Sequence, residues 1–169
     1  IYGNRLISSN QSRSDILISC GMGGGIQEEA KIFIDNLIKL KTVPFKRVWV
    51  EPDIYPIDAP NWMFKAIYTA DMFDKLVASI IRPGVGTVSE SLLSGVKIFT
   101  FFEADNLEMQ QNVCFLEEYE LGVNSKTIQQ AWLDSILYLK NKKQQDFFLQ
   151  KLKKIEFNGE KKAAQVLLN

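Results

Sequence analysis

Residues 82–90 bring together groups that could hold a phosphate beside a sugar hydroxyl. The stretch reads Arg-Pro-Gly-Val-Gly-Thr-Val-Ser-Glu and directly follows a short apolar run that ends at Ile81. A buried strand that stops at a glycine turn and opens into a helix leaves backbone N–H groups at the positive end of the helix dipole. In open α/β folds this place lies at the carboxyl edge of the sheet, where nucleotides bind. Glu90 would then stand where it could accept hydrogen bonds from ribose hydroxyls.

The same stretch also has a structural explanation, which the sequence leaves open. Thr87 and Glu90 are three residues apart. This is the spacing of a capping box, in which a hydroxyl caps the helix and a glutamate reaches back to the cap N–H. Such a cap stabilises a helix by about 1 kcal/mol without any ligand. Arg82 could likewise form a surface ion pair instead of contacting a phosphate.

A second glycine-rich turn, residues 21–25, follows the apolar run Ile16–Cys20 and reads Gly-Met-Gly-Gly-Gly. Its spacing is not the GxGxxG pattern of dinucleotide-binding folds. One explanation is that a turn between a strand and a helix needs a positive φ and close packing, which glycine allows. The other is that its backbone N–H groups contact a phosphate. The position after the first strand favours phosphate contact.

A third candidate region, residues 103–112, follows an apolar run and opens a helix. It reads Glu-Ala-Asp-Asn-Leu-Glu-Met-Gln-Gln-Asn. These carboxylate and amide groups could bind sugar hydroxyls, because they both accept and donate hydrogen bonds. The alternative is a polar loop followed by a solvated first helical turn.

Apolar runs and helical spacing alternate along the chain and predict the elements that position these regions. Strands are predicted at residues 16–20, 47–51, 64–68, 79–81 and 97–102. Helices are predicted at residues 26–40, 71–77 (with Asp71 as a cap), 88–94, 107–119, 128–139, 145–155 and 160–168. Such alternation is typical of a parallel sheet covered by helices on both faces. The expected fold class is therefore α/β, with a Rossmann-like parallel sheet.

Composition and charge narrow the class of protein. A chain of 169 residues is enough for one domain, and its 20 basic and 20 acidic residues give no argument for binding nucleic acid or an anionic membrane. Two cysteines do not make a disulfide framework, so a cytoplasmic protein is expected. No apolar run reaches the ~20 residues that span a bilayer. Membrane association is therefore expected only through a part of the protein outside this chain.

Taken together, these features resemble the C-terminal, nucleotide-sugar-binding domain of GT-B glycosyltransferases. The chain is most similar to the MurG-like and monogalactosyldiacylglycerol-synthase-like group. The features that carry the resemblance are the strand and glycine loop, then RPGVGTVSE, then GVKIFTFF, and a helix with Glu, Gln and Asn that leads to Leu121-Gly122. The resemblance covers most of the chain and is most specific from Arg82 to Gly95.

The resemblance implies roles for individual residues. Nucleotide-binding residues would be Gly21, Gly23, Gly24, Thr69, Arg82, Gly84, Gly86, Thr87 and Glu90. Among them, Glu90 would bind the ribose, the segment 84–87 would lie against the diphosphate, and the backbone at Tyr68 and Thr69 would face uracil. Donor-sugar-binding residues would be Glu108, Gln110 and Gln111. Arg5 could contact a phosphate from the linker.

The domain boundaries and the function follow from the same resemblance. Residues 1–14 are expected to be an interdomain linker, and residues 15–169 the nucleotide-sugar-binding domain. The chain begins with Ile1 and not with Met, so we expect it to belong to a longer protein. An N-terminal acceptor domain, absent from this chain, would supply the acceptor site and the catalytic base, so the fragment alone should be inactive and its catalytic residues are unknown.

The expected function is the donor half of an inverting glycosyltransferase (a hexosyltransferase) that uses a UDP-sugar as substrate, with no metal and no other cofactor. Two alternatives stay open. One is a UDP-sugar hydrolase of the kind found in nonulosonic acid synthesis, in which water replaces the acceptor. The other is a non-catalytic donor-binding subunit that works with a separate acceptor subunit.

Overall fold

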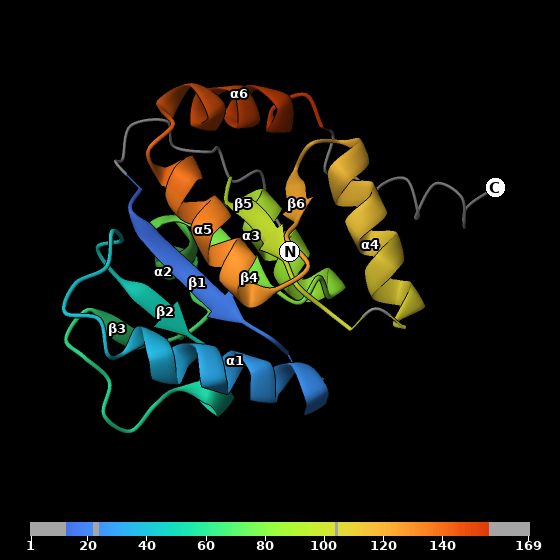
Figure 1. Cartoon of the computed structure of the whole chain (residues 1–169). Coiled ribbons are helices and arrows are strands. Elements are labelled where there is room, and N and C mark those ends of the chain that lie inside the picture. Colours follow the sequence, from blue (N-terminus) through green and yellow to red (C-terminus); the bar gives the residue numbers. More distant parts are fainter. Residues whose placement is uncertain (1–12, 22–23, 104, 156–169) are drawn as a thin grey trace.

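A computed structural model describes residues 13–21, 24–103 and 105–155. They form a six-stranded parallel sheet in the order β3-β2-β1-β4-β5-β6 (Figure 1). Its strands are β1 (Asp15–Ser19), β2 (Val48–Val50), β3 (Met63–Lys65), β4 (Leu76–Ile81), β5 (Lys97–Thr100) and β6 (Gly122–Asn124). The helices are α1 (Gly24–Leu37), α2 (Ala70–Phe73), α3 (Val85–Leu93), α4 (Leu107–Glu118), α5 (Ile128–Leu139) and α6 (Lys142–Leu152). The α/β, Rossmann-like fold expected from the sequence is confirmed.

β1 and β4 form the centre of the sheet, and every residue of both strands is buried. They pair in parallel with Ile18 opposite Ile80, and on its other side β1 pairs with β2, where Ile16 lies opposite Val48. Apolar strands of this kind need cover on both faces. Figure 1 shows α1 and α5 over one face and α3 over the other. The central strands are thereby buried on both faces, and the turns that follow them begin from this buried core.

Four helices differ from the sequence prediction: α1 ends three residues earlier than predicted and α6 lies three residues earlier, while α2 and α3 differ for reasons that the contacts show. α2 is short because Leu76 and Val77 are buried strand residues of β4. Its cap is Thr69, whose Oγ1 accepts a hydrogen bond from the Met72 N–H at 3.3 Å, so the cap predicted at Asp71 is wrong. α3 begins at Val85, three residues before its predicted start, because the glycine-rich segment already has helical geometry there.

The strand β6 escaped the sequence prediction. Its residues, Gly-Val-Asn, show no alternating or continuous apolar pattern. It forms by parallel pairing with β5, in which Ile98 lies opposite Gly122. A methyl group at Gly122 would lie 3.0 Å from Leu116 Cβ, so the close approach of α4 explains the glycine.

Several predictions fall on residues outside the described ranges. They are the linker at residues 1–12, which includes Arg5, and the last helix at residues 160–168. In the part of the chain that the structure describes, no helix combines the length and the apolar character needed to cross a membrane.

Candidate functional site

The candidate residues gather where β1 and β4 end, because the chain leaves these neighbouring strands in opposite directions. α1 leads from β1 to β2, while α3 leads from β4 to β5 on the other side of the sheet. The two turns are joined by the Arg82 N–H, which donates to the Ser19 carbonyl oxygen at 3.0 Å. The carboxyl edge at such a switch of direction is the usual ligand site of an open α/β sheet.

The start of α3 carries no side-chain cap. Its N-cap residue is Gly84, and the helix begins at Val85. Thr87 is therefore the third helical residue and Glu90 the sixth, so the capping box that their spacing suggested is wrong. Glu90 is half-buried, and its carboxylate accepts no hydrogen bond from other described residues. The capping-box explanation for Glu90 is thereby removed.

The fold itself does not require the glycines at this helix start. Gly84 has φ −70° and ψ 144°, which any residue adopts, and Gly86 lies within the helix. A Cβ added at either position would meet no atom within 4 Å. The backbone at both glycines therefore faces open space, and the first N–H groups of a helix have no partner within the helix itself. A ligand could approach this backbone closely.

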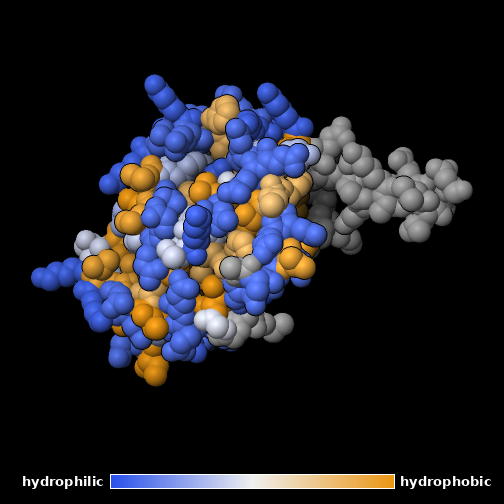
Figure 2. Space-filling model, turned by 45° about the vertical axis from the view of Figure 1, so that its right-hand side comes forward, coloured by the Kyte–Doolittle hydropathy of each residue, from blue (hydrophilic) through white to orange (hydrophobic). Residues whose placement is uncertain are grey.

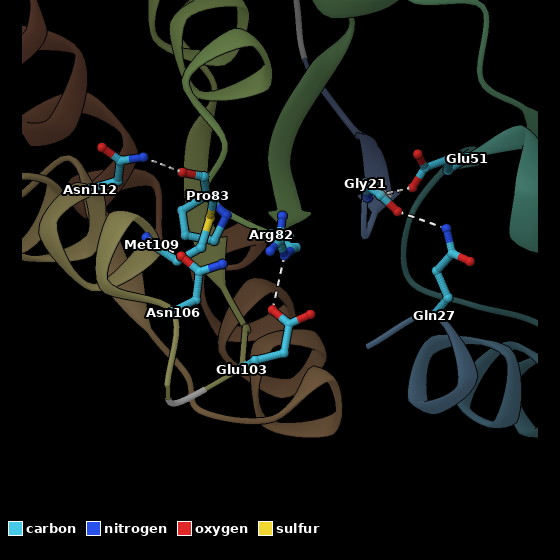
Figure 3. A network of polar contacts seen from close by, with 9 residues as sticks. All are labelled: Gly21, Gln27, Glu51, Arg82, Pro83, Glu103, Asn106, Met109 and Asn112. Atoms are coloured by element: carbon cyan, nitrogen blue, oxygen red, sulfur yellow. Dashed lines mark hydrogen bonds and ion pairs between the residues drawn. The ribbon is translucent and has the colours of Figure 1, made fainter. Parts of the chain in front are cut away.

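The glycine turn after β1 has a different explanation. Gly21 has φ +61°, a conformation that favours glycine whether or not a ligand is present. Its N–H donates to Glu51 Oε2 at 2.9 Å, and its carbonyl accepts a hydrogen bond from Gln27 Nε2 at 2.8 Å (Figure 3). The conformational explanation considered for this turn thus holds at Gly21. Gly24 begins α1, and Gly23 lies outside the described residues.

Glu51, at the end of β2, connects this turn to the region expected to face uracil. Its Oε2 also accepts hydrogen bonds from the Cys20 N–H at 2.7 Å and from Ser19 Oγ at 3.3 Å. Ser19 Oγ in turn accepts a hydrogen bond from the Tyr68 hydroxyl at 3.2 Å. Tyr68 has φ +48°, rare for an aromatic residue, and directly precedes the exposed Thr69 that caps α2.

Burial and the Glu51 carboxylate keep two of these groups protonated. Burial raises the pKa of the Cys20 thiol to about 12, with a further contribution from Glu51. Burial likewise raises the pKa of the Tyr68 hydroxyl to about 12, although its hydrogen bond to Ser19 acts in the opposite direction. Both groups therefore stay neutral at physiological pH.

Arg82 forms an ion pair, which is one of the two roles that the sequence left open for it. Its Nε lies 2.9 Å from Glu103 Oε2, and both side chains are mostly buried (Figure 3). Burial disfavours the charged form of Glu103, but the hydrogen bonds from Arg82 and from the backbone outweigh it, so the pKa of this carboxyl lies below its ordinary value. Because a guanidinium has five N–H donors, this contact leaves Arg82 able to bind a further anion.

A second contact fixes the turn before α3. Asn112 of α4 donates a hydrogen bond from Nδ2 to the Pro83 carbonyl oxygen at 2.8 Å (Figure 3). Asn106 caps α4, accepting a hydrogen bond from the Met109 N–H at 3.1 Å. Asn112 belongs to the region that the sequence suggested for sugar binding, whereas no role was predicted for Glu51. The available signal for Glu51 was its position as the first polar residue after a buried parallel strand.

The residues expected to bind the donor sugar lie in the first turns of α4. Glu108 and Gln111 are exposed and Gln110 is half-buried. At 3.6 residues per turn, Glu108 lies one turn before Asn112 on the same side of α4, whereas Gln111 lies about 100° and Gln110 about 160° around the axis from Asn112. Glu108 therefore lies on the side of α4 whose Asn112 contacts the turn before α3, and Gln110 lies on the opposite side. The described residues contain no group of three or more His, Cys, Asp or Glu side chains that could hold a metal ion.

Solved glycosyltransferase structures have a similar fold. The spinosyn rhamnosyltransferase SpnG, complexed with spinosyn aglycone, matches with a TM-score of 0.59 at 14% identity, over 96% of this chain and 47% of its own. The glycosyltransferase SnogD from Streptomyces nogalater matches with a TM-score of 0.56 at 15% identity, over 96% of this chain and 45% of its own. The glycosyltransferase of kitacinnamycin matches with a TM-score of 0.56 at 14% identity, over 83% of this chain and 38% of its own.

At these identities the likeness establishes a shared Rossmann-like fold. This chain spans less than half the length of each of the three proteins. No protein-family model and no curated protein matches the sequence. The resemblance to the MurG-like group therefore stays a prediction, while the likeness to glycosyltransferases in fold is confirmed.

Proposed function

We propose that this chain is the part of a glycosyltransferase that binds a nucleotide-sugar donor, and that the nucleotide is UDP. One observation carries the proposal. At the carboxyl edge beside the switch of direction, α3 begins without a side-chain cap, at two glycines that neither backbone conformation nor packing requires. Open backbone at a helix N-terminus is suited to a diphosphate, because the free N–H groups and the helix dipole both favour negative charge.

The surrounding residues fit the rest of such a donor. Thr87 lies in the first turn of α3 with Gly86, and Glu90 lies one turn further, with a carboxylate that no described residue occupies and that could accept from ribose hydroxyls. The guanidinium of Arg82 can meet the diphosphate with the donors that Glu103 does not use. Glu108 is the better candidate for the sugar, because it shares the face of α4 on which Asn112 reaches Pro83, and Gln111 is the next candidate along the exposed side of the helix. Tyr68 and Thr69 are the candidates for the base.

In the reaction that this site would serve, an acceptor hydroxyl attacks the anomeric carbon of the sugar, and the bond to the diphosphate breaks on the opposite face. The start of α3 would stabilise the negative charge that develops on the leaving diphosphate. The acceptor site and the catalytic base would come from another domain or subunit. Glycosyltransferases of similar fold, each more than twice as long as the matched region, support this division.

Calorimetric titration of the 169-residue chain with UDP, ADP and GDP tests the proposal. We expect heat of binding with UDP and weaker binding with the other two diphosphates. Equal affinity for all three would contradict the assignment of the base, and absence of binding would contradict the donor site itself.

A further inference from the structure

The turn after β1 already holds a carboxylate at the place where a phosphate oxygen could bind. Glu51 Oε2 accepts hydrogen bonds from two consecutive backbone N–H groups, those of Cys20 at 2.7 Å and Gly21 at 2.9 Å. A third donor, Ser19 Oγ, lies 3.3 Å away. Hydrogen bonds to a charged acceptor are stronger than those between neutral groups. The N–H pair of this turn is therefore satisfied within the chain.

The start of α3 is in the opposite state. It has no side-chain cap, and the backbone at Gly84 and Gly86 faces open space. Arg82 stands between the two turns, and Figure 3 shows its side chain directed to Glu103 and away from Glu51. The α3 side of this edge thus holds an ion pair of Arg82 and Glu103, whereas the β1 side holds the Glu51 carboxylate, which forms no ion pair with the described residues.

We infer that Glu51 is a positioning residue that closes the turn after β1 to anions and so directs the donor's diphosphate to the start of α3. The inference rests on the proposed function. A phosphate oxygen could enter the first turn only by displacing Glu51 from three donors, and any anion beside an undisplaced carboxylate would be repelled. Gly21, with its φ of +61°, then serves the conformation of this turn and not a ligand.

Glu51 also connects the turn after β1 to Tyr68, one of the residues proposed to contact the nucleotide base. Through Ser19 it fixes the hydroxyl of Tyr68, whose backbone is held at φ +48°. Strained backbone of this kind persists only where surrounding contacts determine it. The Glu51 carboxylate therefore holds both the turn after β1 and, through Ser19, the side chain of Tyr68.

Amide signals of the ¹⁵N-labelled chain, titrated with inorganic pyrophosphate, test the inference. In the parent protein we expect the amides of Gly86 and Thr87 to shift and those of Cys20 and Gly21 to stay unchanged. In Glu51→Ala the amides of Cys20 and Gly21 should shift as well, because their N–H groups become available. Shifts of Cys20 and Gly21 in the parent, or their absence in Glu51→Ala, would overturn the inference.

Two further variants sharpen this test. Asp53→Asn removes one negative charge close to the turn but no hydrogen bond to it. The amide signals of Cys20 and Gly21 should therefore stay unchanged in this variant when pyrophosphate is added. Glu51→Gln keeps the size of the side chain and one acceptor, and it should give smaller shifts than Glu51→Ala; if Glu51→Ala does not fold, the Gln variant decides. A purely structural Glu51 would change stability in these variants without creating a second anion site.

The result also separates this inference from the proposed function. If no amide of α3 shifts in the parent, the donor site is wrong. The response of Cys20 and Gly21 in the Glu51 variants still decides whether the carboxylate closes the first turn.

Discussion

Gly86→Ala should change stability and nucleotide affinity in opposite directions. Gly86 is the second residue of α3, and an added methyl group would meet no atom of the chain within 4 Å. Replacing a helical glycine by alanine at a site free of clashes stabilises a protein by about 0.4–1 kcal/mol, mainly by restricting the unfolded chain. For a domain of this size the gain corresponds to an increase in Tm of roughly 1–4 °C.

The same methyl group would occupy the space through which a diphosphate approaches the backbone. Loss of one charged hydrogen bond costs about 1.5–3 kcal/mol. At about 1.4 kcal/mol per factor of ten, Kd for UDP should rise roughly ten- to a hundred-fold. A change that stabilises the fold and weakens binding identifies a glycine kept for its ligand.

Thermal unfolding and calorimetry with UDP on the same preparation measure both effects. Gly25→Ala is the matched control, because Gly25 also lies in the first turn of a helix and its added Cβ meets no atom within 4 Å. It should stabilise the protein similarly and leave UDP affinity unchanged. If Gly86→Ala binds UDP as tightly as the parent, the diphosphate does not lie on this backbone and the reasoning fails.

Three further outcomes follow from single side chains. Glu90→Gln should weaken UDP binding on the order of ten-fold or more through loss of a charged acceptor. Its Tm should stay nearly unchanged, because Glu90 does not cap α3. Calorimetry and thermal unfolding measure the two effects, and a lower Tm with the affinity of the parent protein would refute a ligand role. The Glu103 carboxyl has a folded-state pKa below its ordinary value of 4.5, so the stability that its ionised form contributes is complete above that pH and is lost as the pH falls through the lowered pKa. Glu103→Gln should therefore make the free energy of unfolding, measured by urea unfolding, less dependent on pH in the acid range. An unchanged dependence would contradict this. Burial, with Lys151 nearby, lowers the pKa of Lys97 from 10.5 to about 8. Between these pH values the unfolded chain binds more protons than the folded chain, so the free energy of unfolding should rise with pH there. This rise should disappear in Lys97→Met, and its persistence would point to another group.

The sheet was predictable because its central strands are apolar runs that end at glycine turns. In β1 and β4 every residue is buried, so the pattern alone identifies them. β6 could not be found in this way, because a Gly-Val-Asn segment becomes a strand only through its pairing with β5. Long-range pairing of this kind leaves no local signal.

The candidate site was predictable in its location but not in its contacts. The edge formed by the turns after β1 and β4 follows from the order of the elements, and Arg82 does form the ion pair that was one of its two interpretations. The capping box at Thr87 and Glu90 was wrong because α3 starts earlier, at a glycine N-cap. The spacing of two residues does not determine where a helix begins when glycines precede it.

Glu51 shows a further limit of the sequence. Thirty residues separate it from Gly21, and only the parallel register of β1 and β2 brings its carboxylate to that N–H group. The glycine-rich turn looked suited to a phosphate because its N–H groups were expected to be free. Whether such groups are free depends on a neighbouring strand, which the local sequence does not reveal.

A crystal structure of this chain with UDP tests the central claim most directly. We expect the diphosphate within hydrogen-bond distance of the N–H groups of Gly86 and Thr87, the ribose hydroxyls on the Glu90 carboxylate, and Glu51 still bound to Gly21. A nucleotide bound elsewhere, or a diphosphate on the turn after β1 with Glu51 displaced, would contradict the account.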